Sequence, residues 1–150
     1  MQVREIMTRE PACCTPNTKL QDVARMMSEH DCGEIPICES ESSRRPIGVI
    51  TDRDIAVRVV AAGRDPSKMT ARDCMSSPVV TIEPGASVEE CAQLMESYQI
   101  RRVPVVERDG SCCGMVAQAD LATKASPETS IEMVAAVSEP NVLASSVGGA

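Results

Sequence analysis

The chain has 150 residues, a formal net charge of -7, 43% hydrophobic residues and only 1% aromatic residues. This length allows one domain or two small halves that share a core. The negative charge argues against wrapping of a nucleic acid backbone, and the lack of aromatic platforms argues against binding of single-stranded RNA or DNA.

The N-terminus does not have the composition of a targeting or membrane segment. Residues 1–5 lack the apolar stretch of a signal peptide, and no run of about 18 apolar residues, the length that crosses a bilayer, occurs anywhere in the sequence. We therefore expect a cytoplasmic protein that has neither a membrane nor a nucleic acid as its partner.

An extended segment at residues 12–15 opens the first unit, and a proline turn and an amphipathic helix follow. The apolar positions of this helix recur at the spacing i, i+3, i+4, i+7, namely Leu20, Val23, Ala24 and Met27. Thr18 with Gln21 has the residue types of a capping box. Residues 35–38 then form a strand, and because its proline has no N–H to donate, we expect the strand to lie at a sheet edge or to start at the proline.

Residues 48–55, with the sequence Gly-Val-Ile-Thr-Asp-Arg-Asp-Ile, form a buried strand that runs directly into a helix. The hydroxyl of Thr51 and the carboxylate of Asp54 lie at the turn between them. A carboxylate at a helix start is a good acceptor for paired hydroxyls, while Arg53 and the free N–H groups of the helix suit an anion. The apolar residues of this helix are Ile55, Val59 and Val60.

The same elements recur in the second half of the chain. Met7 and Met75 set an offset of 68 residues, which falls to 66 between Gly48 and Gly114 because the first copy has a longer loop at residues 40–46. Arg44 and Arg45 lie in this loop and are interpreted as solvated side chains, with a lid over a phosphate as the alternative. Insertions of this kind belong in surface loops.

The second copy starts with an extended segment at residues 79–82. Its helix has the apolar positions Val88, Cys91, Ala92 and Met95 and a capping box of Ser87 with Glu90. A strand at residues 103–106, a second strand and a shorter helix at residues 120–125 complete it. We therefore divide the chain into a first repeat (1–63), a linker (64–71), a second repeat (72–126) and a C-terminal helix and tail (127–150).

These features resemble a tandem pair of cystathionine-β-synthase (CBS) domains. The resemblance rests on the strands Ile35-Pro36-Ile37 and Val103-Pro104-Val105, on the run from Gly48 to Asp54 and on its copy, which ends in Asp120-Leu121. It implies an α/β (α+β) fold with two β-α-β-β-α repeats packed with pseudo-two-fold symmetry and two clefts between them. It also implies a homodimer that is regulatory and not catalytic, and that acts on a protein partner of unknown identity.

The ligand implied by the resemblance is an adenine nucleotide or adenosyl compound: AMP, ADP, ATP, NAD or S-adenosylmethionine. In one cleft Asp54 would accept hydrogen bonds from ribose hydroxyls and Thr51 would donate to ribose or phosphate. The residues around the adenine there would be Ile35, Pro36 and Ile37. This role of the proline strand is implied by the resemblance and not by the spacing of its residues.

In the other cleft Asp120 would accept the hydrogen bonds from the ribose hydroxyls, and Arg102 or Arg101 would reach phosphate. The residues around the base there would be Val103, Pro104 and Val105. Ala117 stands where the family has Thr or Ser, so this cleft lacks one hydroxyl donor and its occupancy is open.

A structural interpretation competes with the ligand interpretation at each of these positions. Thr51 and Asp54 also form a helix cap, with Thr51 as N-cap. Because the second copy keeps Asp120 without a cap hydroxyl, we infer that capping alone does not account for the acid. Arg101 and Arg102 form either a solvated surface pair or a phosphate contact.

The eight cysteines do not form a Cys-x-x-Cys motif, and the sequence has one histidine, so we predict no zinc site. No catalytic motif is present either. The repeat places Cys32, Cys74 and Cys91 at core positions, and a disulfide from Cys13 or Cys14 to Cys38 is a hypothesis. The alternative functions are a redox-responsive protein and a purely structural dimerisation protein with empty clefts.

Overall fold

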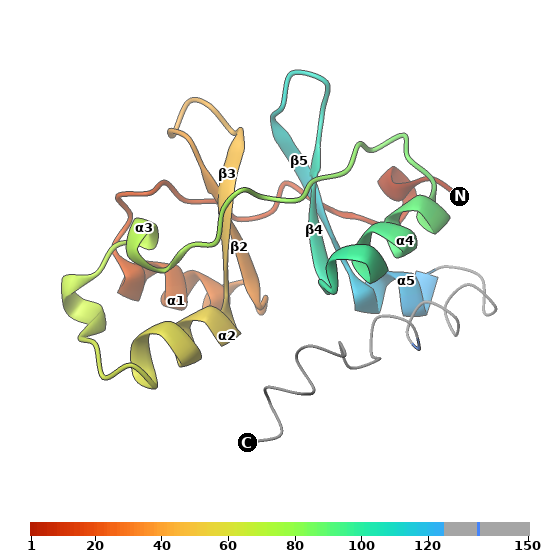
Figure 1. Cartoon of the computed structure of the whole chain (residues 1–150). Helices are drawn as coiled ribbons and strands as arrows, with labels where there is room; N and C mark the ends of the chain where they lie inside the picture. The colour runs from red at the N-terminus through yellow and green to blue at the C-terminus, as the bar shows by residue number, and fades with distance from the viewer. Residues whose placement is uncertain (125–134, 136–150) are drawn as a thin grey trace.

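Two similar halves lie side by side in the computed structural model, which describes residues 1–124 and 135 (Figure 1). The elements of the first half are α1 (Leu20–Glu29), β2 (Glu34–Cys38), β3 (Pro46–Thr51), α2 (Asp52–Ile55) and a π-helical turn (Ala56–Val60). The elements of the second half are α4 (Val88–Tyr98), β4 (Arg102–Val106), β5 (Cys112–Ala117) and α5 (Gln118–Lys124). The repeated order of helix, two strands and helix confirms the predicted fold class.

Each half has one antiparallel strand pair at its centre. In the first half β2 pairs with β3, and in the second β4 pairs with β5 in the equivalent register, with Glu34 opposite Thr51 and Arg102 opposite Ala117. The proline-containing strands lie at sheet edges, as predicted. The extended segments predicted at residues 12–15 and 79–82 make only single parallel bridges, at Cys14 and Ile82, and are not full strands.

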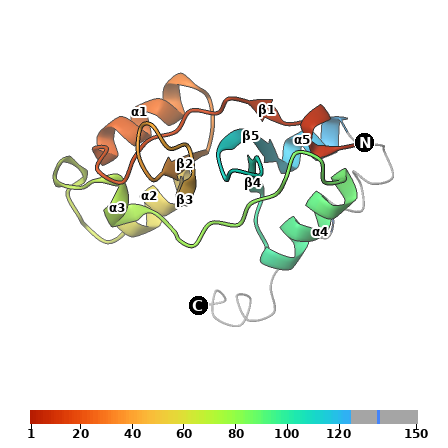
Figure 2. The same ribbon diagram turned by 90° about the horizontal axis from the view of Figure 1, so that it is seen from above.

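The first residues of each repeat pack on the opposite half. Strand β1 (Thr8–Arg9) pairs with β5, and Val3 and Ile6 are buried in the core of the second half. Conversely, helix α3 (Ala71–Cys74) packs on the first half, where Cys74 is fully buried. Figure 2 shows the N-terminus beside α4 and α5, far from α1, which follows it in the sequence. Each half is therefore completed by a segment that the sequence assigns to the other repeat.

Two separate apolar cores result from this exchange. Their residues are aliphatic, methionine and cysteine side chains, as the composition predicts. Cys74 and Cys91 have no exposed surface, which confirms their predicted role in the cores, and the half-buried Cys32 packs against the first core. On the second helix of the first half, Val59 is buried whereas Val60 is 73% exposed.

The two predicted capping boxes at the starts of the long helices have different outcomes. Ser87 and Glu90 form theirs, because the Ser87 hydroxyl accepts the N–H of Glu90 and the Glu90 carboxylate accepts that of Ser87. The box predicted for Thr18 and Gln21 is wrong. Helix α1 begins after Lys19, and the Thr18 hydroxyl instead accepts the N–H of Thr15, 3.1 Å away, in the preceding turn.

The helix predicted after Pro127 lies outside the described residues. Within residues 1–124, no helix has both the length and the apolar character needed to cross a bilayer.

Candidate functional site

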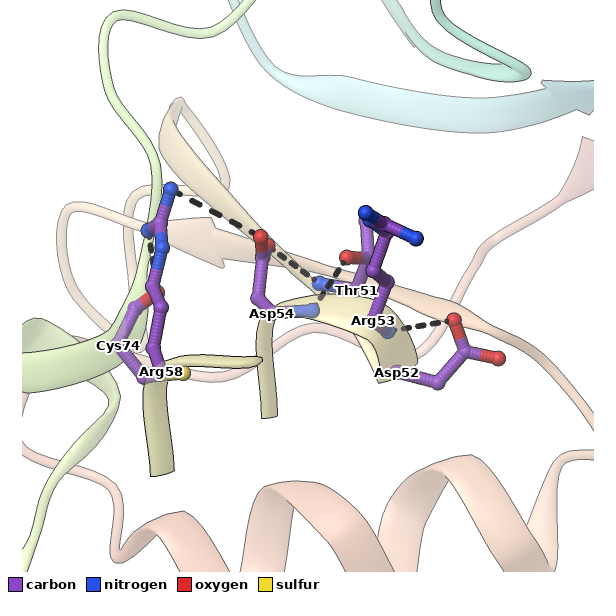
Figure 3. Close-up of polar contacts among 6 residues, drawn as sticks. All are labelled: Thr51, Asp52, Arg53, Asp54, Arg58 and Cys74. Atoms are coloured by element: carbon purple, nitrogen blue, oxygen red, sulfur yellow. Dashed lines mark hydrogen bonds and ion pairs between the residues drawn. The ribbon is translucent and has the colours of Figure 1, made fainter. Parts of the chain in front are cut away.

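The turn from β3 into α2 positions Thr51 and Asp54 (Figure 3). The Thr51 hydroxyl accepts the N–H of Asp54 at 3.0 Å, and Asp54 Oδ2 accepts the N–H of Thr51 at 2.9 Å. Arg58 Nη2 lies 3.8 Å from Asp54 Oδ1, while its Nη1 donates to the Cys74 carbonyl. The hydroxyl proton of Thr51 is not used by this box, so it is able to donate to a ligand.

The turn from β5 into α5 repeats this arrangement around Asp120. Asp120 Oδ2 accepts the N–H of Ala117 at 2.8 Å, and Lys124 Nζ lies 3.2 Å from Asp120 Oδ1. Lys124 Nζ also donates to the carbonyl of Ile6, in the exchanged N-terminal segment. Each acid therefore has a basic side chain four residues later, Arg58 or Lys124. The sequence analysis missed these two residues, although the i, i+4 spacing on a helix would have indicated them.

The hydrogen bond from Ala117 to Asp120 changes one inference from the sequence. Asp120 caps a backbone N–H even though the hydroxyl of the first copy is missing. Capping therefore accounts for Asp120 as well as for Asp54, and the inference that it could not is wrong. A test of ligand binding must consequently separate the loss of a helix cap from the loss of a ligand contact.

A cavity of about 480 Å³ lies beside Asp120 and is walled by both halves. Its walls come from residues 8–12, residues 30–34, Met115 and Ala117, together with Asp120 and Arg102; we call it the Asp120 cavity. The volume is within the range that small ligands and cofactors occupy in proteins. Among the predicted site residues, this cavity brings together Asp120 and Arg102, while Thr51 and Asp54 do not belong to its walls.

The remaining predicted site residues are not walls of the Asp120 cavity and have different environments. Arg53 and Arg101 are exposed. The residues of the two proline strands are all buried, and four of them belong to the apolar cores, namely Ile35, Ile37, Val103 and Val105. Pro36 and Pro104 are buried as well. None of these six residues is a wall of the Asp120 cavity, and a contact of the strands with adenine stays a prediction.

Glu34 is a wall residue of the Asp120 cavity that the sequence analysis did not identify. Its side chain is only 8% exposed, and its Oε2 is buried without a hydrogen-bond partner. Arg102 crosses over the adjacent Gly33, so closely that a Cβ there would lie 2.5 Å from Nη2. Burial raises the pKa of Glu34 to about 8, while the nearby Arg102 opposes this shift and Asp54 adds to it. Glu34 is therefore able to donate a proton to a ligand near neutral pH.

We expect the stability of the protein to depend on pH through Glu34. Its pKa rises from an ordinary 4.5 to about 8 on folding, so the folded chain holds one more proton than the unfolded chain between these values. The contribution is fully present below pH 4.5 and is lost as the pH rises to 8. The slope is up to about 1.4 kcal/mol per pH unit.

Urea unfolding of the wild type and of Glu34→Gln at a series of pH values measures this dependence. The amide keeps the shape of the neutral acid but does not titrate, so the variant should gain stability relative to the wild type as the pH rises. All other titrating groups are shared by the two proteins. Parallel pH curves would show that Glu34 ionises in the folded protein as it does in water.

Comparison with known proteins assigns the chain to a family. Residues 3–61 and 71–127 each match the family model of the CBS domain, so the chain belongs to the CBS domain family and carries two copies of the domain. It is 35% identical to hypoxic response protein 1 of Mycobacterium tuberculosis over 142 residues, which are 95% of this chain and 97% of that protein. The two CBS domains of this chain therefore match nearly the whole of that relative.

Two solved structures show the same fold. The crystal structure of Hypoxic Response Protein I, with two coordinated zinc ions, has a TM-score of 0.75 at 35% identity and covers 84% of this chain and all (100%) of that one. The CBS domain pair of protein MJ0100, in complex with 5′-methylthioadenosine and S-adenosyl-L-methionine, has a TM-score of 0.73 at 27% identity. The match covers 81% of this chain and 97% of that one. In residues 1–124, no group of three or more potential ligand side chains is arranged to hold a metal.

Proposed function

We propose that this protein is a non-catalytic regulatory module that binds an adenine nucleotide or adenosyl ligand in the clefts between its two CBS repeats. The observation that carries the proposal is the Asp120 cavity, where both halves meet around a carboxylate and a guanidinium. A ligand there contacts both repeats, so its binding changes how they sit against each other. The adenosyl compounds bound by the MJ0100 domain pair support the ligand class.

The polar groups of the Asp120 cavity suit a nucleoside. Each carboxylate oxygen of Asp120 has one protein partner, which leaves acceptor capacity for a pair of ribose hydroxyls. Arg102 offers donors to a phosphate or carboxylate, and the protonated Glu34 offers one further donor. The second cleft would use Asp54, whose oxygens are held in the same way, and the hydroxyl of Thr51.

The homodimer, the cytoplasmic location and a protein partner that receives the signal belong to the same proposal. Two apolar side chains on one helical segment support the dimer, because Val57 is 51% and Val60 73% exposed. Neighbouring exposed apolar groups are favourable interface material. A molecular mass of a single chain in light scattering would contradict the dimer.

A thermal-shift panel on the reduced protein tests the ligand class. The ligands are AMP, ADP, ATP, NAD and S-adenosylmethionine, and GMP serves as the control because it shares ribose and phosphate with AMP but not the base. A ligand at 100 times its dissociation constant should stabilise the protein by about 2.7 kcal/mol. An equal response to GMP and AMP would contradict adenine recognition, and no response to any compound would leave the clefts without this function.

A further inference from the structure

Three cysteines from separate segments meet where the two halves join. Cys13 precedes the first helix, Cys38 ends β2, and Cys112 begins β5 of the other half. Cys38 is 2% and Cys112 4% exposed, whereas Cys13 is half-buried and lines a second cavity of about 330 Å³, together with Cys38 and Arg44. Cys13 is thus the thiol of the three that small solutes reach best. All eight cysteines are free thiols in the structure.

Arg44 holds its positive charge beside the sulfur of Cys13. Its Nη2 lies 3.3 Å from Cys13 Sγ and also donates to the carbonyl of Pro11, and its Nε donates to the carbonyl of Cys112. The backbone of Arg44 is held as well, because its carbonyl accepts the N–H of Cys112 at 2.8 Å. From the sequence, Arg44 is expected to be solvated. Its side chain is exposed, but its guanidinium donates hydrogen bonds to the Cys13 sulfur and to the carbonyls of Pro11 and Cys112.

The neighbouring thiols act on Cys13 in the same direction as Arg44. The thiols of Cys112 and Cys38 hydrogen-bond to the sulfur of Cys13, and these bonds, together with Arg44, hold its pKa well below the usual range of a thiol. The same hydrogen bonds, together with burial, raise the pKa of Cys38 and Cys112. The lowered pKa of Cys13 favours its thiolate, the form of cysteine that acts as a nucleophile, whereas the raised pKa values of Cys38 and Cys112 favour their protonated thiols. When protonated, the Cys13 thiol donates to the carbonyl of Pro11, 3.3 Å away.

We propose that Cys13 is a peroxide-sensitive modification site and that the two thiols in contact with it, Cys112 and Cys38, convert its oxidised form into a disulfide. The Cys13 thiolate attacks one oxygen of a hydroperoxide, the O–O bond breaks, and the other oxygen leaves and takes up a proton. Oxidation of Cys13 removes the negative sulfur that is the largest cause of the raised pKa of Cys38 and Cys112. One of these two thiols then gives up its proton, and its sulfur attacks the resulting sulfenic acid. The S–S bond forms, the S–O bond breaks, and the departing hydroxide leaves as water with the proton of the attacking thiol. Two electrons pass from the two thiols to the peroxide.

The position of the cluster gives the disulfide a structural consequence. A Cys13–Cys112 bond joins the first repeat to β5 of the second, whereas a Cys13–Cys38 bond stays within the first repeat. Pro11 and Ala12, next to Cys13, are walls of the Asp120 cavity. Oxidation thus constrains the chain beside that cavity. The modification itself does not depend on whether the cavity binds a ligand.

Mass-spectrometric mapping after treatment of the reduced protein with one equivalent of hydrogen peroxide, in EDTA, tests the proposal. We expect the free thiol of Cys13 to disappear first and Cys13 to be found in a disulfide with Cys112 or Cys38. In Cys13→Ser the peroxide should leave the other seven thiols largely unchanged. Circular dichroism establishes that the variant is folded.

Arg44→Gln and Arg45→Gln form a matched pair, because Arg45 is the neighbouring arginine and contacts the carbonyl of Asp109 instead of a thiol. At a pH where Cys13 is mostly protonated, its reaction with iodoacetamide should slow by about tenfold for each unit by which Arg44→Gln raises its pKa. Arg45→Gln should react as the wild type does. Equal rates in the two variants, first oxidation at the half-buried Cys32 or Cys113, or a Cys13 sulfenic acid that yields no disulfide would each overturn the proposal.

Discussion

Replacing Asp54 or Asp120 by alanine is expected to remove most of the ligand-dependent stabilisation at the cleft that the residue belongs to. Hydrogen bonds to a charged acceptor contribute about 1.5–3 kcal/mol each. Loss of the two hydrogen bonds from the ribose hydroxyls should therefore weaken ligand binding at least about 100-fold. A stabilisation of about 2.7 kcal/mol at 100 times the original dissociation constant then falls to about 0.4 kcal/mol. Thermal unfolding with and without the ligand measures the effect.

Asp73→Ala is the control that separates capping from binding. Thr70 and Asp73 form the same type of box at the start of α3, with the Thr70 N–H donating to Asp73 Oδ2 at 2.9 Å, and Asp73 is exposed and is not a wall residue of the Asp120 cavity. All three variants should lose about 1 kcal/mol of stability without ligand. Only Asp54→Ala and Asp120→Ala should also lose the response to ligand. An unchanged response in both would show that these acids are helix caps alone.

Ile6→Ala should cause a large loss of stability, although Ile6 lies only a few residues from the N-terminus. Its side chain is 1% exposed and belongs to the core of the second half, together with Val88, Met95 and Leu121. Truncation of a buried isoleucine costs about 2–5 kcal/mol, which is a large part of the total stability of a small domain. Chemical unfolding monitored by circular dichroism measures the loss.

Ile6→Val provides a graded comparison, since the removal of one methylene group should cost only about 0.5–1.5 kcal/mol. The exchange of segments between the halves also predicts that both halves unfold in one transition. A loss below about 0.5 kcal/mol for Ile6→Ala, the range of ordinary surface substitutions, would contradict the packing of the N-terminal segment on the second half.

The sequence was sufficient to predict the elements whose residues are close along the chain. The spacing of Leu20, Val23 and Met27 indicated α1, and the prolines of the two edge strands indicated their place in the sheets. The exchange of the segments around Ile6 and Cys74 was not predictable, because local spacing does not show which half an apolar side chain packs against. The repeat nevertheless aligned these two residues as equivalent core positions.

The candidate site was predictable only in part for the same reason. Asp54 and Asp120 were found because each belongs to a repeated local motif. Glu34 was missed because a single acid at the start of an apolar strand looks like an ordinary end of that strand. Its importance comes from its burial and from the nearby Arg102, which belongs to the second half. Likewise, Arg44 resembles a loop arginine until the fold brings Cys13 and Cys112 beside it.

Isothermal titration calorimetry of the reduced protein with AMP and with S-adenosylmethionine tests the ligand-binding function most directly. We predict saturable heat with at least one of the two compounds, at no more than one ligand per cleft, and a binding constant weakened by Asp120→Ala or Asp54→Ala but not by Asp73→Ala. Titrations that show only the heat of dilution with both compounds would contradict an adenosyl-binding role for these clefts.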